Sequence, residues 1–449
     1  MKKGICTIFG LLTFITMPAQ HDHMHHDTSA VKKDTMKMEM PHAYSLNLPM
    51  TRNGSGTGWM PDNSVMYGHG IHSGNWMFMF HTNLFFRYNK QDITNKGNRG
   101  GEKFDAPNWL MGMGQRKIGE RGLFHFSVML SLDPLTVGAE GYPLLFQTGE
   151  TYNGNRLVDR QHPHDFFSEL SVAYTHMISK DVDITGYVAY PGEPALGPVA
   201  FMHRVSALNN PDAPLSHHWQ DATHITYGVA TLGIRFGMFK AEGSVFTGRE
   251  PDEKRYDFDK PKFDSYSYRL LFNPTKEFAF QVSQAFIKSP EEIEPGKNIN
   301  RTTASVIHHL SFTGSNRYLA TTVAWGYNSS EHNEHSILVE PNLQLDKTAI
   351  YARYEWIQKD AEELELSQFV PGSIFDIQAF TFGINRVLLR KFGTNIALGA
   401  QGSVFIADNR LDSIYGKYPL SGEIYLRISP HLMHMHNHSS KKNESQMNH

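Results

Sequence analysis

The sequence predicts an all-β protein: a transmembrane, antiparallel, up-and-down β-barrel of about 16 strands (14 to 18), with long outer loops and short periplasmic turns. Three observations predict it. Apolar and polar residues alternate with a period of two over segments of about 9 to 13 residues, the length that a tilted strand needs to cross a membrane. The chain contains 29 phenylalanines, 19 tyrosines and 37 glycines. Tight and long connections alternate between the segments.

The first twenty residues have the features of a secretory signal peptide. Lys2 and Lys3 supply the charge, residues 5–17 form an apolar run, and Ala19 precedes a plausible cleavage site. The run is too short for a membrane helix, which needs about 20 apolar residues. The single cysteine, Cys6, lies inside this segment, so the mature protein has no disulfide and no thiolate metal ligand.

The alternation is clearest in residues 122–133, where Phe124 and Phe126 fall on one face and His125 and Ser127 on the other. Segment 224–236 has no clean apolar face and is the least regular. The sixteen predicted strands are 75–88, 107–116, 122–133, 165–178, 181–190, 224–236, 238–248, 264–273, 277–288, 301–313, 317–328, 335–345, 347–358, 375–388, 393–406 and 420–428.

The connections indicate how the barrel is oriented. Most odd-numbered connections are long, including 89–106, 134–164, 191–223 and 359–374, whereas the even-numbered ones are tight. Bacterial barrels have short periplasmic turns and long outer loops, so both termini are expected in the periplasm of a Gram-negative cell. The expected parts are a signal peptide at 1–20, a Met/His-rich periplasmic segment at 21–72, the outer-membrane barrel at 73–429 and a His/Met-rich periplasmic tail at 430–449.

Both tails are rich in histidine and methionine. Thioether sulfur favours Cu(I), and imidazole accepts Cu(II), nickel or zinc. Copper is therefore the leading metal, with zinc or nickel as alternatives, and no organic cofactor is expected. The alternative is that the tails are merely polar and unstructured. The candidate tail ligands are His21, His23, His25, His26, Met36, Met38, Met40, His431, His434, His436 and His438.

A second group of metal-ligating residues lies in the second and third outer loops: His162, His164, Asp165, His203, His217, His218, Asp221 and His224. His162 and His164 flank Pro163, so an extended backbone would aim both rings the same way. We expect these histidines to form one structured cluster, with at least three rings on one ion and Asp165 or Asp221 orienting a ligand. The alternative is that they only hydrogen-bond inside a folded loop plug.

Other function classes are less favoured. The formal charge of −3 gives no sign of a nucleic-acid-binding surface. His164, Asp165 and Ser168 include the residue types of a hydrolase triad, but no nucleophile motif frames a serine, so we expect no enzyme. Sixteen strands leave room for an aqueous channel, although loops 134–164 and 191–223 are long enough to plug it. Inward-facing charges are expected at Glu169, Glu242, Arg269, Glu340, Arg353, Glu355, Glu423 and Arg427.

The layout of a Met/His-rich stretch from His21 to Met50 followed by strands resembles the outer-membrane barrels of bacterial copper resistance, the copper resistance protein B type. The His-rich loops 161–165 and 216–224 are more similar to uncharacterised outer-membrane proteins of metal-resistance settings. The resemblance implies a barrel that binds copper or a similar metal and contributes to its sequestration, efflux or resistance. Its implied partners are outer-membrane lipid, metal ions and periplasmic metal carriers or efflux components. A general porin without a metal role is the alternative, followed by an outer-membrane hydrolase.

Overall fold

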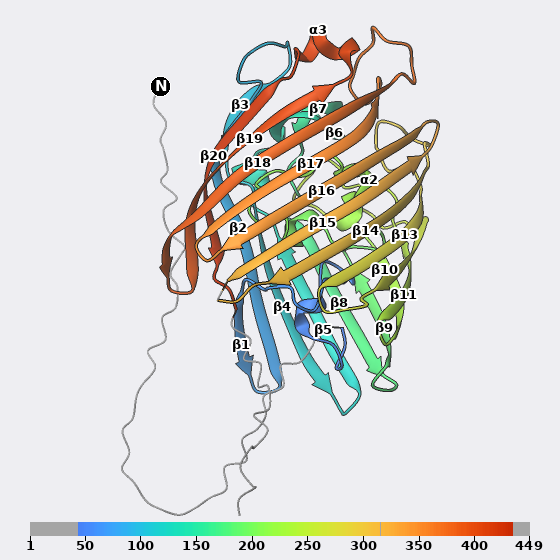
Figure 1. The fold of residues 1–449 in the computed structure, drawn as a ribbon. Helices are drawn as coiled ribbons and strands as arrows, with labels where there is room; N and C mark the ends of the chain where they lie inside the picture. The colour runs from blue at the N-terminus through green and yellow to red at the C-terminus, as the bar shows by residue number, and fades with distance from the viewer. Residues whose placement is uncertain (1–43, 315, 434–449) are drawn as a thin grey trace, which may run out of the picture. The chain divides into compact units, whose positions relative to one another are not determined.

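The computed structural model describes residues 44–314 and 316–433 (Figure 1). Sixteen antiparallel strands close into a barrel, because each pairs with the next and the last, β20, pairs with β2. The predicted fold class and strand number are confirmed. The strands are β2 (Trp76–Gln91), β4 (Asn108–Ile118), β5 (Gly122–Leu130), β8 (Phe167–Met177), β9 (Val182–Ala189), β10 (Val229–Phe236), β11 (Phe239–Phe246), β12 (Ser265–Phe272), β13 (Phe278–Ile287), β14 (Ile299–Ser311), β15 (Arg317–Ser329), β16 (Asn333–Leu345), β17 (Thr348–Asp360), β18 (Ile374–Lys391), β19 (Thr394–Ala407) and β20 (Leu420–Pro430).

The two faces of the wall follow the period-two pattern of the sequence. On β12, Tyr266, Tyr268 and Leu270 are more than half exposed on the outside, whereas Ser267 and Arg269 between them are buried. All eight predicted inward-facing charges are buried as well. Apolar and aromatic side chains therefore face the membrane and polar side chains face the lumen, as in other transmembrane barrels.

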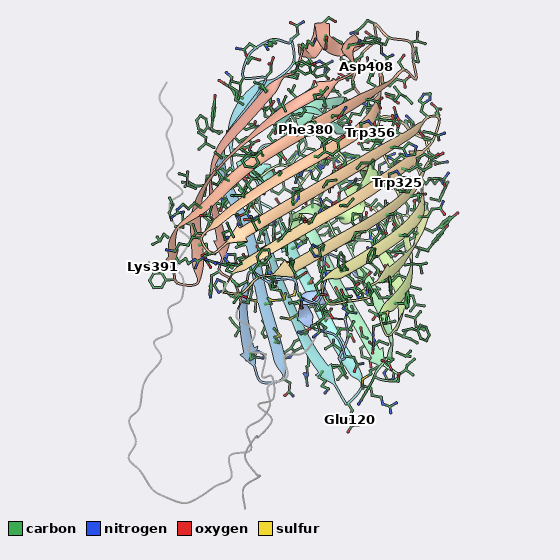
Figure 2. All side chains as sticks on the ribbon, viewed as in Figure 1. Glu120, Trp325, Trp356, Phe380, Lys391 and Asp408 are labelled. Atoms are coloured by element: carbon green, nitrogen blue, oxygen red, sulfur yellow. The ribbon has the colours of Figure 1, made fainter. Side chains whose placement is uncertain are left out.

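Tight turns and long loops occupy opposite ends of the barrel. Figure 2 labels Glu120 and Lys391 at the tight-turn end and Asp408 at the long-loop end. The hydroxyl of Ser45 donates to Asp183 beside one tight turn, and the amide of Met433 donates to the carbonyl of Met66. Both ends of the described chain consequently lie at the tight-turn end.

Two short strands extend the wall around β2. Strand β1 (His69–Ser73) pairs with the first residues of β2, which β20 does not reach. Strand β3 (Gly101–Asp105) pairs with the last residues of β2, beyond the stretch that β4 covers. No helix of the described chain is long and apolar enough to cross a membrane.

The predicted strand 224–236 begins too early. The strand starts at Val229, and residues before it form a short 3-10 helix, η3 (Ala222–His224). Their hydrogen bonds explain the difference, because His224 bonds to the carbonyl of Asp221 and Thr226 pairs with Gly192 inside the lumen.

The lumen is filled by three segments, 44–67, 133–164 and 191–228, which we call the plug. The first contains η1 (Met50–Arg52), and the second contains α1 (Asp133–Thr136) and a hairpin of β6 (Tyr142–Tyr152) and β7 (Asn155–Gln161). The third contains η2 (Phe201–His203), α2 (His217–Gln220) and η3. Beyond the plug, η4 (Asn409–Leu411) and α3 (Asp412–Tyr415) form part of an outer loop.

Apolar packing and buried ion pairs hold the plug to the wall. The ring of Phe146, fully buried on β6, packs against Phe405 of β19 and Tyr415. The guanidinium of Arg204, also fully buried, lies 3.3 Å from Glu340 of β16 and 2.8 Å from Asp221 of the plug. A buried charge of this kind needs an oppositely charged partner, so the pair between Arg204 and Glu340 fixes one position of the plug on the wall.

Candidate metal site

Five of the predicted histidines come together in the plug: His162, His164, His217, His218 and His224. The ring centroid of His217 lies 5.3 Å from that of His218 and 5.1 Å from that of His224. His164 lies 5.5 Å from His224 and 6.4 Å from His162, and His162 lies 5.8 Å from His218. We call this group the histidine cluster. Its members come from the 162–164 stretch and from the neighbouring elements α2 and η3, which follow that stretch much later in the sequence.

Three histidines of the cluster share one hydrogen-bonding arrangement. The Nδ1 of His164 lies 2.8 Å from Asp133, and the Nδ1 of His217 lies 2.6 Å from the carboxylate of Asp221. The Nδ1 of His224 lies 2.9 Å from the Asp221 carbonyl oxygen. Ionised carboxylates and carbonyls only accept, so each Nδ1 carries the proton and each neutral ring has its lone pair on Nε2. Oxygen-oriented imidazoles of this kind are typical of metal ligands.

The Nε2 atoms of the cluster lie in a closed environment. The Nε2 atoms of His164, His218 and His224 are buried and have no hydrogen-bond partner within the described chain. The ring of Phe201 covers the group, with centroids 5.4 Å from His217 and 6.2 Å from both His164 and His224. Buried polar atoms without a protein partner are uncommon in native proteins, and those that occur often contact a bound ion or water.

The backbone makes room for His218 at one glycine. Gly149 on β6 has φ +112°, and a Cβ there would lie 2.4 Å from the imidazole of His218. A larger residue would therefore displace the hairpin from α2.

Burial favours the neutral form of four rings of the cluster, those of His162, His217, His218 and His224. It lowers the pKa of His218 to about 3 and holds the pKa of His162 and His224 well below 6.5. Burial also lowers the pKa of His217, although Asp221 opposes the effect. Despite burial, His217 and Arg204 hold the pKa of Asp221 well below its usual range. The site thus combines neutral imidazoles with an ionised carboxylate near neutral pH.

The cluster is wider than a closed coordination sphere. Within the described residues, three groups bring ligand atoms within 4.8 Å of one another, and the histidine cluster is not among them. Three of its rings would have to rotate or approach to reach one ion. Metal binding by these residues stays a prediction.

Two predicted members lie outside the cluster. His203 stacks on Trp109 with centroids 5.0 Å apart, because η2 turns it toward the other end of the lumen. Asp165 lies 3.5 Å from Arg255, and burial raises its pKa to about 7. The carboxylates that bond to histidines of the cluster are instead Asp221, which was predicted, and Asp133, which was not.

The remaining candidates are placed as follows. His431 bonds through Nδ1 to the Gly393 carbonyl at 2.7 Å, beside His69. The hydroxyl of Ser168 donates to the Asp165 carbonyl while His164 faces Asp133, so the triad residue types are not arranged as a triad. Ten tail candidates lie outside the described residues: His21, His23, His25, His26, Met36, Met38, Met40, His434, His436 and His438.

Sequence reasoning missed three acidic neighbours of the cluster. Asp133 bonds to His164, Glu150 lies 3.1 Å from Nε2 of His162, and Glu250 lies 3.7 Å from Nδ1 of His218. Asp133 stands 31 residues before His164 and no motif links the two. The one available signal was that Asp133 begins the loop that ends at His164.

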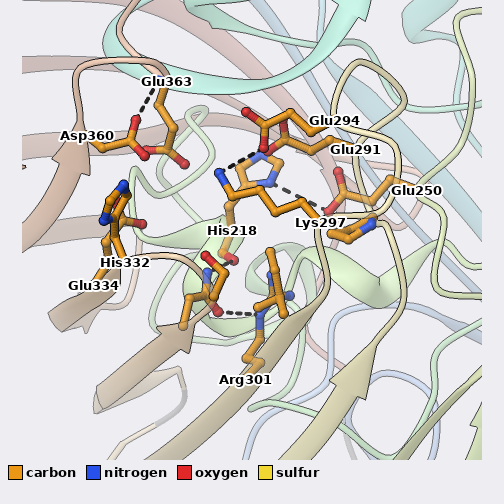
Figure 3. A pocket seen from close by; sticks show the side chains of 14 residues that line it. His218, Glu250, Glu291, Glu294, Lys297, Arg301, His332, Glu334, Asp360 and Glu363 are labelled. Carbon is orange, nitrogen blue, oxygen red and sulfur yellow. Dashed lines mark hydrogen bonds and ion pairs between the residues drawn. The ribbon is translucent and has the colours of Figure 1, made fainter. Parts of the chain in front are cut away.

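Above the cluster, at the long-loop end, lies an acidic cavity of about 40 Å³. Figure 3 shows His218 beside Glu250, Glu291 and Glu294, with further carboxylates across the cavity. Burial raises the pKa of Glu250 and Glu291, and burial together with Asp360 raises the pKa of Glu363 to about 7. The cavity lining is Pro290, Ile299, Asn328 and Ser330, the cations Lys297 and Arg301, the two histidines His218 and His332, and the acids Glu250, Glu291, Glu294, Glu334, Asp360 and Glu363.

No protein-family model and no curated protein matches the sequence. The fold is similar to that of Salmonella typhi OmpF, solved in complex with daunomycin: 9% identity over 81% of this chain and 99% of that chain, with a TM-score of 0.50. The fold is that of a porin-like outer-membrane barrel. An anion-selective porin from Comamonas acidovorans shares 11% identity over 80% of this chain and 100% of its own, with a TM-score of 0.47. The outer membrane channel DcaP of Acinetobacter baumannii shares 9% identity over 80% and 99%, with a TM-score of 0.44.

Proposed function

We propose that this porin-like barrel binds a transition-metal ion, copper foremost, on the histidine cluster of its plug, and so contributes to metal sequestration or export at the outer membrane. In this proposal it is not an enzyme, and its tight-turn end with both tails faces the periplasm. Zinc and nickel are the alternative ions, since imidazole accepts all three.

One observation carries the proposal: three histidines have Nδ1 bonded to oxygen, and two of them, His164 and His224, bury an Nε2 that has no hydrogen-bond partner among the described residues. His164 and His217 each face a carboxylate, and His224 faces a carbonyl. Burying an unpaired polar atom costs about 1 to 3 kcal/mol. His125 and His309 also bury unpaired ring nitrogens, but neither has its Nδ1 held by an oxygen, as a metal ligand does.

The acidic cavity supports the choice of a cation. Six carboxylates against two permanent cations line it, and Oε1 of Glu334, whose residue is only 8% exposed, has no partner in the described part of the chain. An excess of carboxylates in a walled cavity favours a cation, and a bound cation would release the protons that burial retains on them. His218 connects this cavity to the cluster.

A second candidate function is a general channel without a metal role. The likeness of the fold to a porin favours it. The filled lumen is the observation against it. Single-channel recording in a planar bilayer separates the two: the metal-binding proposal expects little steady current, whereas a large open pore indifferent to copper or zinc would support the channel.

Metal titration of the full-length protein in detergent tests the proposal. His164→Ala, His217→Ala and His224→Ala should each weaken one equivalent of Zn²⁺ or Cu²⁺ by about 100-fold or abolish it. Asp133→Asn should weaken the same equivalent by about 10- to 100-fold, the usual effect of losing an orienting partner.

The matched control is His176→Ala, which removes an exposed histidine of β8. Each variant must migrate as a folded barrel before heating in SDS. Unchanged affinity and stoichiometry in all three folded histidine variants would refute the cluster as a metal site.

A further inference from the structure

A second cavity, of about 100 Å³, lies in the lumen toward the tight-turn end and is lined by thioethers. Its walls combine strands β2 and β4 with plug segments 44–67 and 191–228. The methionines that line it are Met60, Met66, Met79, Met111, Met113 and Met202.

Strand register places these sulfurs together. Met79 of β2 pairs with Met113 of β4, and His81 pairs with Met111. These are inward positions of the wall, where a barrel interior is ordinarily polar. The outward residue between Met79 and His81 is Phe80, 47% exposed, so the alternation sorts thioethers inward and aromatic rings outward.

Methionine often fills irregular gaps in a core, and that is the competing explanation. A gap-filling side chain should leave no space, yet a cavity remains between these residues. Next to it, the Gln115 amide donates to the sulfur of Met77 at 3.2 Å and to that of Met50 at 3.6 Å. Two sulfurs next to the cavity thus accept a hydrogen bond from a polar side chain.

His81 adds a nitrogen ligand to the cavity. Its Nδ1 lies 2.8 Å from the carbonyl oxygen of Tyr67, which only accepts, so the neutral ring has its lone pair on Nε2. That Nε2 is buried and has no hydrogen-bond partner among the described residues. No aspartate or glutamate of the described chain lines the cavity.

We propose that this methionine-lined cavity is a second metal site, which binds a soft monovalent ion, Cu(I) or Ag(I), on thioether sulfur and on Nε2 of His81. Thioether-rich, carboxylate-free donor sets select such ions over hard divalent cations. The proposal goes beyond the histidine cluster, since it uses other residues and another class of ion.

A small cavity of about 40 Å³ lies between the two sites. His164 and Asp133 line one part of it, and Trp109 and Met202, which also line the methionine cavity, line another. The lumen therefore contains, in order from the long-loop end, carboxylates, imidazoles and thioethers.

Nuclear magnetic resonance of the full-length protein, labelled with ¹³C-methyl methionine and titrated with Ag(I), tests the proposal on the wild type. The methyl signals of Met79, Met111 and Met202 should shift together. Each is assigned by the disappearance of one signal in Met79→Leu, Met111→Leu or Met202→Leu. If these three signals stay unmoved at excess Ag(I) while other methionine signals shift, the proposal is overturned.

Competition for Cu(I) with a chromogenic chelator gives a second readout. The double variant M79L/M111L should weaken one equivalent by about tenfold or more. Met238→Leu, which changes a half-exposed methionine of the β10–β11 turn, should leave it unchanged. Equal Cu(I) affinity in the wild type and the folded double variant would also overturn the proposal.

Zn²⁺ titration of the same samples reports the histidine cluster through the one equivalent that His164→Ala, His217→Ala and His224→Ala are expected to weaken or abolish. If the wild type lacks this Zn²⁺ equivalent but its methionine signals respond to Ag(I), only the proposed function is refuted. Retained Zn²⁺ binding without the Ag(I) response would refute only the methionine site.

Discussion

His164, His217 and His224 show how one residue type acquires a role from its surroundings. Each donates Nδ1–H to an oxygen of Asp133 or Asp221, and the plug surrounds the side of the ring that carries Nε2. Sequence spacing indicated that histidines of two loops would meet. It could not indicate the partners, because Asp133 is brought to His164 only by the fold of α1.

The lowered pKa values of the buried histidines predict how metal binding by the cluster depends on pH. An exposed imidazole, with a pKa of about 6.5, is half protonated at that pH and then competes poorly for metal. Burial lowers the pKa of two of the three proposed ligands, His217 and His224, and holds that of His224 well below 6.5. Zn²⁺ affinity of the cluster should change by less than about threefold between about pH 7.5 and 5.5, as isothermal titration calorimetry can show.

The sign of the stability effect follows from the same shift. The folded-state pKa of the buried histidines lies below their unfolded value of about 6.5, so as the pH falls these histidines take up protons in the unfolded protein first. The stability that these neutral rings contribute is present above about pH 6.5 and is lost as the pH falls through the folded-state pKa. A tenfold loss of Zn²⁺ affinity between about pH 7.5 and 6 would contradict the affinity prediction, because it would show that the rings are exposed.

At the scale of elements, the strands were predictable, and loops 134–164 and 191–223 were recognised as long enough to plug the lumen, but the internal structure of the plug was not predictable. Each membrane strand has one face in lipid and one in the lumen, and that asymmetry appears in the sequence as alternation. The hairpin of β6 and β7 is surrounded by the barrel, so Tyr142–Thr148 is buried on both faces and shows no alternation. The paired methionines of β2 and β4 did carry a period-two signal, but only the register of the two strands shows that they face one another.

Arg204 tests how firmly the plug is held. Arg204→Ala would remove the cation that Asp221 and Glu340 share, so that Asp221 would keep its bond to His217 and Glu340 its ion pair with Arg353. Removing one partner of a buried ion pair typically costs about 3 to 5 kcal/mol. Segment 191–228 should then loosen. We expect larger and noisier single-channel currents than in the wild type, together with weaker Zn²⁺ binding.

Arg410→Ala is the matched control for Arg204, because it removes an exposed arginine paired with Asp408 in an outer loop. It should leave both current and metal affinity unchanged. If Arg204→Ala also behaves like the wild type in a folded barrel, the buried ion pairs do not hold the plug in place.

At the scale of the whole molecule, deleting the tails should distinguish their metal binding from that of the barrel. The described fold begins at Tyr44, and Met433 is still bonded to Met66. Deleting residues 21–42 and 434–449 should therefore leave a heat-modifiable, SDS-resistant barrel in the outer-membrane fraction. Its total copper stoichiometry should fall, while one tightly bound Zn²⁺ or Cu²⁺ equivalent is retained.

The control for this deletion is the same truncated protein carrying His217→Ala, which should lose that last equivalent. A truncated, folded barrel that binds no metal would assign all binding to the tails. A truncated barrel with undiminished copper stoichiometry would remove the capture role of the tails.

The histidine cluster as a metal site is tested most directly by anomalous X-ray diffraction from crystals of the full-length protein loaded with Zn²⁺ or Cu²⁺. We predict one anomalous peak in the plug, about 2.0 to 2.1 Å from Nε2 of His164, His217 and His224, the usual distance for zinc and imidazole nitrogen. The three rings should have moved toward one another around it. Fully loaded crystals that show an ordered, empty cluster, with the anomalous signal elsewhere, would contradict this account.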